Sequence, residues 1–491
     1  EGFREAPPPP DDPADTRTIW KEWGFEDKMR VLKGAMLAAN EDKQIVFVQS
    51  DGKAVRAVAT ASGVIFVPIE SPSQWAILCL DLGLRFMSTE SEGAVAPFKD
   101  IMTLLIGEAS WDFPVVERAV EVPVFGEDGS LRTDAGYHAG AKVYLDPRID
   151  FTFVPERVTD EDIETALDII GYTLADFPFS DVFTGADPLP PRVHGEGKTP
   201  NFARGVSSRA NAHAMLLQPF ARSLIGNEPT PMYFIDKSEK GTGANYLANV
   251  LGYMLYGTPM PPQVVSEREE EFEKAITASL YEGRPTIFLD NLNHELSSAA
   301  LASALTSGIW TGRILGKSHV PRIPVRALWL LAANNGQISE ELMRRVVPIR
   351  LDAALPNPAS DRPPSYYIIP NLMEHLRNTR RDLVWAAHVL VQNYITVAAE
   401  DPQKLAELTL DLPVLQSFQR WSEVMGGILA CAGVPGFLGN LGGYKRDNVR
   451  DDKSGFAEYV ADLFERHGEK WLGLDEALDI LQEAAPNMPG D

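Results

Sequence analysis

The chain has 491 residues, 44% of them hydrophobic and 23% charged, which is typical of a globular protein, and this length predicts about three domains of ~150 residues. It carries 45 Lys and Arg against 69 Asp and Glu, which gives a net charge of −24. This charge argues against nucleic-acid binding over the whole surface, but it allows a basic pore or groove inside an acidic shell. The sequence contains no run of ~18 apolar residues, so we predict no membrane span, and it starts with Glu and no signal-peptide pattern, so we expect it to begin inside a longer gene product.

The N-terminal part combines a linker with an α/β pattern. Residues 1–16 are rich in proline and acid and predict a linker, and 17–190 predict an α/β domain. Asp-Gly pairs at 51–52 and 128–129, each between apolar runs, predict hairpin turns. Thr159 precedes a helical spacing of apolar residues and predicts a helix cap.

The middle of the chain alternates strands and helices. A Pro- and Gly-rich stretch at 184–200 marks a domain boundary, and 200–355 predict a parallel sheet with covered faces. The first helix is expected to start at a serine cap near 207 and to stop at Gly226. The expected strands are 231–235, 285–291 and 325–335, and the later helices are 245–257, 266–283 and 297–310.

The C-terminal part is expected to be helical. A second Pro-rich link at 354–365 leads into a helical region over 365–445. Residues 450–491 predict two or three short helices, the size of a small winged-helix domain.

A glycine-rich turn follows the first core strand and precedes a helix. Backbone N–H groups of such a turn and the positive end of the helix can hold a phosphate. The turn contains Gly241, Thr242 and Gly243, but Ala244 stands where a phosphate loop keeps its lysine and Asn245 where it keeps a hydroxyl. We expect Lys237 or Lys240 to supply the missing positive charge. An ordinary strand-to-helix turn is the alternative.

The second expected strand ends in a carboxylate. Asp290 lies at the carboxyl end of a parallel strand, where open α/β sheets bind ligands, and could hold Mg²⁺. Asn291 follows it and can position water without acting as a base, while Glu295 is a possible base. The alternative is that Asp290 caps the next helix.

The third strand ends in Asn334 and Asn335, and either amide matches a sensor position beside a γ-phosphate. Arg344 and Arg345 follow shortly, and one of them could reach a neighbouring subunit's nucleotide as an arginine finger. Plainer alternatives are a turn-forming Asn pair and a solvated helix end. The order of turn, Asp strand, Asn strand and Arg pair strengthens the combined interpretation.

Between the Asp and Asn strands the chain is locally basic. The segment 310–327 has five basic residues and no acid, with two glycines and two prolines that predict a loop or hairpin. In a ring, Arg313, Lys317 and His319 would face a central channel and grip a DNA phosphate. A solvated basic loop is the alternative.

These segments together resemble the AAA+ ATPase/helicase domain of phage, prophage and plasmid primase–helicase replication proteins, with a layout similar to superfamily 3 helicases. The resemblance covers most of the chain from about residue 40 and is most specific between Asp290 and Asp352. Its pieces are 207–226, 241–250, 287–318, 328–335 and 342–352, with looser pieces at 120–145, 367–395 and 411–438.

The resemblance implies a cytoplasmic, hexameric ring that hydrolyses ATP with Mg²⁺ and moves on single-stranded DNA through a central channel. It maps the phosphate loop to 240–245, the metal site to Asp290, the sensor to Asn334 or Asn335, and the finger to Arg344 or Arg345. A primase domain normally lies upstream in such proteins. Ala244 and Asn245 depart from the family pattern, so a ring-forming scaffold that binds DNA or a partner with weak or no hydrolysis remains the alternative function. Two distant cysteines, Cys79 and Cys431, exclude a cysteine zinc ribbon and fit a reducing compartment.

Overall fold

The computed structural model describes residues 5–49, 52–60, 63–108, 110–181, 204–290, 292, 295–313 and 321–448. The chain divides into two compact units, Glu1–Gly443 and Tyr444–Asp491. The predicted winged-helix region at 450–491 therefore lies outside the described residues. Among the described residues, no helix combines the length and apolar composition needed to cross a bilayer.

The N-terminal part folds around its own apolar core. Its buried residues include Leu32, Trp75 and Phe86, and they form a cluster that ends at Phe113. The Asp-Gly pair at 51–52 lies between antiparallel β2 and β3, and the pair at 128–129 lies between β8 and β9, so both predicted hairpins are confirmed. Its elements are α1 (Phe25–Lys43), α2 (Pro72–Asp81), α3 (Lys99–Ile106), β1 (Thr18–Trp20), β2 (Val46–Val48), β3 (Ala54–Thr60), β4 (Gly63–Pro68), β5 (Arg85–Met87), β6 (Ala94–Val95), β7 (Arg118–Val120), β8 (Val124–Phe125), β9 (Leu131–Arg132), β10 (Gly136–His138) and β11 (Val143–Leu145).

The largest sheet of the described residues has six strands, in the order β12-β19-β13-β18-β15-β14. All its pairings are parallel except the pairing of β12 with β19, so the predicted parallel α/β sheet is confirmed. The short edge strands β12 and β14 and the inner strand β19 were not predicted from the sequence. The strands are β12 (Phe179–Ser180), β13 (Met232–Lys237), β14 (Pro262–Val264), β15 (Thr286–Asp290), β18 (Leu328–Asn334) and β19 (Val346–Leu351).

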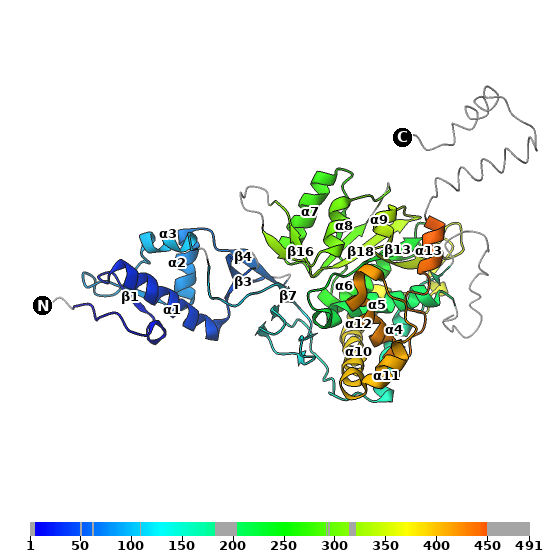
Figure 1. Cartoon of the computed structure of the whole chain (residues 1–491), viewed down its shortest axis with the longest axis horizontal. Helices are drawn as coiled ribbons and strands as arrows, with labels where there is room; N and C mark the ends of the chain where they lie inside the picture. Colours follow the sequence, from blue (N-terminus) through cyan, green and yellow to red (C-terminus); the bar gives the residue numbers. More distant parts are fainter. Residues whose placement is uncertain are drawn as a thin grey trace, which may run out of the picture. The chain divides into compact units, whose positions relative to one another are not determined.

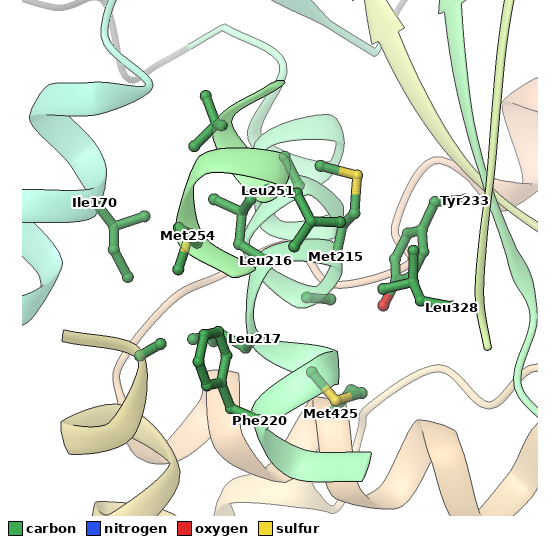
Figure 2. Packing of buried hydrophobic residues seen from close by; sticks show 14 of the residues in the cluster. Ile170, Met215, Leu216, Leu217, Phe220, Tyr233, Leu251, Met254, Leu328 and Met425 are labelled. Atoms are coloured by element: carbon green, nitrogen blue, oxygen red, sulfur yellow. The ribbon is translucent and has the colours of Figure 1, made fainter. Parts of the chain in front are cut away.

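Helices cover both faces of this sheet (Figure 1). On one face, inward side chains such as Tyr233 and Leu328 pack against α5 and α6, and Figure 2 shows them near Met215, Leu251 and Met425. The helices are α4 (Asp160–Thr173), α5 (Val206–Ile225), α6 (Ala244–Tyr256), α7 (Glu269–Tyr281), α8 (Ala299–Thr306), α9 (Glu340–Met343), α10 (Leu372–Glu400), α11 (Pro402–Thr409), α12 (Gln419–Cys431) and α13 (Leu441–Asn448). The predicted helical region after the sheet is therefore confirmed over its described part.

Helix caps decide where two of these helices begin. Thr159 caps α4 in a capping box with Asp162, as predicted. The predicted serine cap of α5 is wrong, because the N-cap is Gly205 in a left-handed conformation. The first amides of the helix, those of Ser207 and Ser208, instead donate to the Asp181 carboxylate at 2.9 and 2.8 Å.

The segment predicted as a helix over 297–310 is shorter in the structure. Helix α8 ends at Thr306, and the chain continues as β16 (Ile309–Thr311), which pairs antiparallel with β17 (Arg322–Pro324). The basic segment is therefore a hairpin in its described arms, one of the two forms predicted.

Candidate nucleotide-binding site

The glycine-rich turn connects β13 to α6 at the carboxyl edge of the sheet. Gly241 and Gly243 have φ values of 81° and 117°, a region that favours glycine. A Cβ at Gly241 would lie 2.7 Å from the Cβ of Ala359, so a side chain has no room there. The Thr242 hydroxyl donates to the Glu239 carbonyl at 2.5 Å and holds the turn closed. The loop thus has the tight, helix-capping form that suits an anion.

Asp290 lies next to the first turn of α6. The Nδ2 of Asn245 donates to Oδ2 of Asp290 at 2.7 Å, and this hydrogen bond joins the first turn of α6 to the end of β15. Asp290 does not cap α8, because the cap of α8 is Ser298, whose Oγ accepts from the Leu301 amide at 3.1 Å. Glu295 is exposed, and Asn291 lies outside the described residues.

A buried ion pair joins two strands next to the start of the glycine-rich turn. Arg350 on β19 pairs with Asp236 on β13, with 7% and 3% of the two side chains exposed. Burial raises the pKa of Asp236 from 3.8 to about 6 even though the charge of Arg350 lowers it. The Gly336 amide donates to the same carboxylate at 3.2 Å, so the pair also fixes the chain just after β18.

Asn335 connects this ion pair to the turn. Its Oδ1 accepts from Arg350 at 3.3 Å, and its Nδ2 donates to the Ser238 carbonyl at 2.8 Å. Its φ of 45° makes it a left-handed residue at the end of β18. With both ends of its amide engaged by the protein, Asn335 holds the turn in place.

Asn334, the last residue of β18, has a different environment. It pairs with Lys237 in the register of β13 and β18, so it lies at the start of the turn. Its Oδ1 is buried and has no hydrogen-bond partner within the described part of the chain. A buried acceptor without a partner is unfavourable, which makes Asn334 the better candidate of the two for contact with a ligand or its water.

A cavity of ≈ 170 Å³ opens beside the turn. The turn glycines line it together with Phe177, Tyr246, Tyr367 and Ile369. This volume is below the ~300–1,000 Å³ of a whole small-molecule pocket, so the cavity fits one flat part of a ligand such as a base. Tyr246 is 55% exposed and forms one accessible wall.

Among the described residues, Arg362 is the one basic side chain that lines this cavity. It is 6% exposed, donates from Nη2 to the Gly241 carbonyl at 2.6 Å and from Nε to the Pro358 carbonyl at 3.0 Å, and lies over the ring of Tyr367. No carboxylate among the described residues forms an ion pair with it. A buried, fixed guanidinium therefore lies against the backbone of the turn.

The lysine candidates are less fixed than Arg362. Ala244 is 2% exposed, so the usual lysine position is filled by a packed methyl group. Lys240 is exposed and Lys237 half-buried, and neither side chain forms an ion pair with a described residue. Their charge is available, but nothing described fixes its position.

The arginine pair lies at the other edge of the sheet. The Arg345 carbonyl accepts from the Met232 amide at 3.0 Å, at the start of β13, whereas the turn follows its end. Six residues of strand, roughly 20 Å, separate the two points. Arg344, 67% exposed and paired with Glu340, and Arg345, 20% exposed, therefore could act only on a neighbouring subunit's nucleotide.

The basic hairpin is described only in part. Arg313 and Arg322 are exposed, and Arg326 is held by Glu117 at 2.8 Å, which removes it from the predicted basic surface. Lys317 and His319 lie outside the described residues. The DNA-binding role of the hairpin stays a prediction.

No group of three or more His, Cys, Asp or Glu side chains that could hold a metal occurs among the described residues. A Mg²⁺ ion needs only one or two protein carboxylates when phosphates and waters complete its shell, so Asp290 fits such an ion.

Sequence reasoning missed Asp236, Arg350 and Arg362. Asp236 and Arg350 occur in apolar strands, where a charged residue signals a buried pair. Arg362 gave no such signal, because it lies in a Pro-rich link.

The chain matches no protein-family model and no curated protein. Among solved structures it is similar to "The A form apo structure of NrS-1 C terminal region-CTR", at 11% identity and TM-score 0.36, covering 77% of this chain and 80% of that one. It is also similar to "SCCmec type IV Cch - active helicase", at 14% identity and TM-score 0.36, covering 90% and 78%. A JCV helicase structure follows at 14% identity and TM-score 0.21, covering 54% and 73%. Similarity this low carries no conclusion about this chain.

Proposed function

We propose that this chain is an ATP-driven helicase or translocase that moves on single-stranded DNA, built around an AAA+-type core and working as a hexameric ring in a phage- or plasmid-type replication protein. The observation that carries the proposal is the 2.7 Å hydrogen bond between Asn245, in the first turn of α6 directly after the glycine-rich turn, and Asp290 at the end of β15. It brings the anion-binding turn and the candidate metal carboxylate to one point.

The strand order supports this interpretation. Strand β18 lies between β13 and β15, so its last residue, Asn334, lies between the glycine-rich turn and Asp290. The chain runs from β13 outward to β14 and later crosses back over β13 to β19, a change of direction at which open α/β sheets bind ligands.

The residues present fit a magnesium nucleotide. The amides of Thr242 and Gly243 and the start of α6 would hold phosphate, and the cavity lined by Tyr246 and Tyr367 would hold the base. Asp290 would hold Mg²⁺, which when bound neutralises charge on the phosphates. Arg362, with Lys237 and Lys240, would supply the positive charge that Ala244 cannot.

The ring and the DNA contact rest on two further features. Arg344 and Arg345 lie away from their own turn, as a residue acting across a subunit interface must. The β16–β17 hairpin carries Arg313, Lys317 and His319, the residues proposed to contact a DNA backbone in the channel. An upstream primase domain belongs to the same proposal.

A second candidate is a ring-forming scaffold that binds DNA or a partner and hydrolyses ATP weakly or not at all. The observation that favours it is the packed methyl group of Ala244 in place of a mobile lysine. The two candidates share a fold and differ in rate.

An ATPase assay with and without single-stranded DNA, on the wild type and on Asp290→Ala, separates the two. A rate that DNA stimulates and the substitution abolishes supports the motor. A low rate that neither DNA nor the substitution changes supports the scaffold. Mass measurement with and without nucleotide tests the ring: a mass that stays monomeric in both conditions contradicts both candidates.

A further inference from the structure

Three arginines meet in the interior at the amino-terminal edge of the central sheet, far from the glycine-rich turn. Arg118 comes from β7, Arg222 from α5 and Arg326 from the chain just before β18. All three line one small cavity with Pro285 and Leu328, which lie where β15 and β18 begin. Arg118 is 6% exposed and Arg222 4% exposed, so their charges are buried.

Two of these guanidinium groups have partners. Arg326 pairs with Glu117, with 2.8 Å between Nε and Oε2, and 10% of the Glu117 side chain is exposed. Arg222 donates to the carbonyls of Gly226 at 2.8 Å, Glu228 at 3.0 Å and Val325 at 3.2 Å.

Arg118 has no such partner. Its guanidinium carries five N–H donors, and none of them forms a hydrogen bond within the described part of the chain. These nitrogens are not sealed off from solvent, unlike Nε of Arg222, so they can reach a small solute. Its pKa is lowered from 12.5 to about 10, chiefly by burial; the charge of Glu117 opposes this shift and the charge of Arg326 adds to it. Glu117 offsets only part of the charge of the three arginines, and largely buried positive charge in excess is costly, so a negative group is favoured at this point.

The space beside Arg118 sets the size of that group. Two cavities of ≈ 30 Å³ each adjoin it, one shared with Arg222 and the other with Glu117. One water needs ~10–15 Å³, so each cavity admits about two waters or one small anion, and a nucleotide is too large. Glu121 also lines the first cavity, but the opposite charges that act on its carboxyl group are those of Arg148 and Arg380.

We propose that the cavity between Arg118, Arg222 and Arg326 is a binding site for a small monovalent anion of the halide class. The anion accepts hydrogen bonds from Arg118 and balances the excess of buried positive charge. It thereby fixes β7 against α5 and the start of β18, and so stabilises the joint between the N-terminal strands and the central sheet. This site is independent of the proposed nucleotide function.

Thermal unfolding in sodium bromide and in sodium gluconate at equal ionic strength tests the site. When bromide replaces gluconate so that its concentration rises tenfold, we expect the melting temperature of the wild type to increase by roughly 1–3 °C more than that of Arg118→Met. General salt effects act on both proteins and cancel in this difference. Arg381→Met, an exposed arginine on α10, is the matched control and should behave like the wild type.

The proposal is overturned if the bromide effect is the same in Arg118→Met as in the wild type, or if bromide and gluconate give the wild type the same melting temperature. Should Arg118→Met not fold, wild-type crystals soaked in bromide give the answer. An anomalous peak within hydrogen-bond distance of the Arg118 guanidinium supports the site, and ordered water alone at that place refutes it.

Discussion

The ion pair beneath the glycine-rich turn gives a sharp prediction for Arg350→Met. This change leaves the Asp236 carboxylate buried, with 3% of its side chain exposed, and with the Gly336 amide as its remaining hydrogen-bond donor among the described residues. Removing one partner of a buried pair costs about 3–5 kcal/mol of unfolding free energy. Asn335 also loses a donor, so the turn should loosen at Ser238.

The cost of Arg350→Met should depend on pH in a definite direction. In the wild type the pKa of Asp236 is 3.8 in the unfolded chain and about 6 in the folded protein. The part of the unfolding free energy that is linked to this group is therefore lost as the pH rises from 3.8 to about 6, and it is constant above that. Without Arg350 the folded pKa is higher still. The folded variant then keeps its proton above about pH 6 while the unfolded chain does not, and the difference from the wild type grows by about 1.4 kcal/mol per pH unit.

Urea unfolding followed by tryptophan fluorescence, at several values between about pH 5 and about pH 8, measures this difference. The double variant Asp236→Asn/Arg350→Met is the control, since it has no carboxyl group to titrate and should show no growing difference. A gap between Arg350→Met and the wild type that is constant over this range would refute the burial argument for Asp236.

Two further changes test the packing around the site. Gly241→Ala should lower the free energy of unfolding by about 1–3 kcal/mol, because the new Cβ would lie 2.7 Å from the Cβ of Ala359 and the φ of 81° disfavours a side chain. The control is Gly171→Ala on α4, where a new Cβ meets nothing within 4 Å, so this variant should be neutral or stabilising in the same urea unfolding assay. Equal losses of stability in both variants would contradict the account of the turn. His213 is buried on α5, and burial lowers its pKa from 6.5 to about 4. The unfolded chain therefore takes up a proton before the folded chain does, and the free energy of unfolding falls by about 3 kcal/mol as the pH drops from 6.5 to about 4. His213→Gln should remove this loss of stability in acid, and an unchanged pH profile of unfolding would show that His213 is not held neutral.

Much of the central sheet was predictable because its strands are continuous apolar runs with clear stops. The runs ending at Asp290 and at Asn334 gave strands with nearly correct ends, and the Asp-Gly pairs gave both hairpins. Strands β12 and β14 were missed because two or three residues carry no periodicity. The start of α5 was misjudged because the carboxylate that accepts from its first amides belongs to Asp181, 26 residues before Ser207.

The site was predictable in outline and not in its contacts. Sequence order suggested that the turn and Asp290 approach each other, and the Asn245 contact agrees with this. The sequence could not distinguish Asn334 from Asn335, since the difference depends on which amide faces Arg350 and the Ser238 carbonyl. It could not reveal Arg362 either, because the link that carries it returns to the turn only through tertiary packing.

The most direct measurement is the calorimetric affinity of the wild type and of Asp290→Ala for ATP, with and without Mg²⁺. Convergence of the turn and Asp290 on one nucleotide predicts that the wild type binds ATP more tightly when Mg²⁺ is present and that Asp290→Ala loses this metal-dependent gain. Absence of ATP binding to the folded wild type, or an equal Mg²⁺ effect in both proteins, would contradict it.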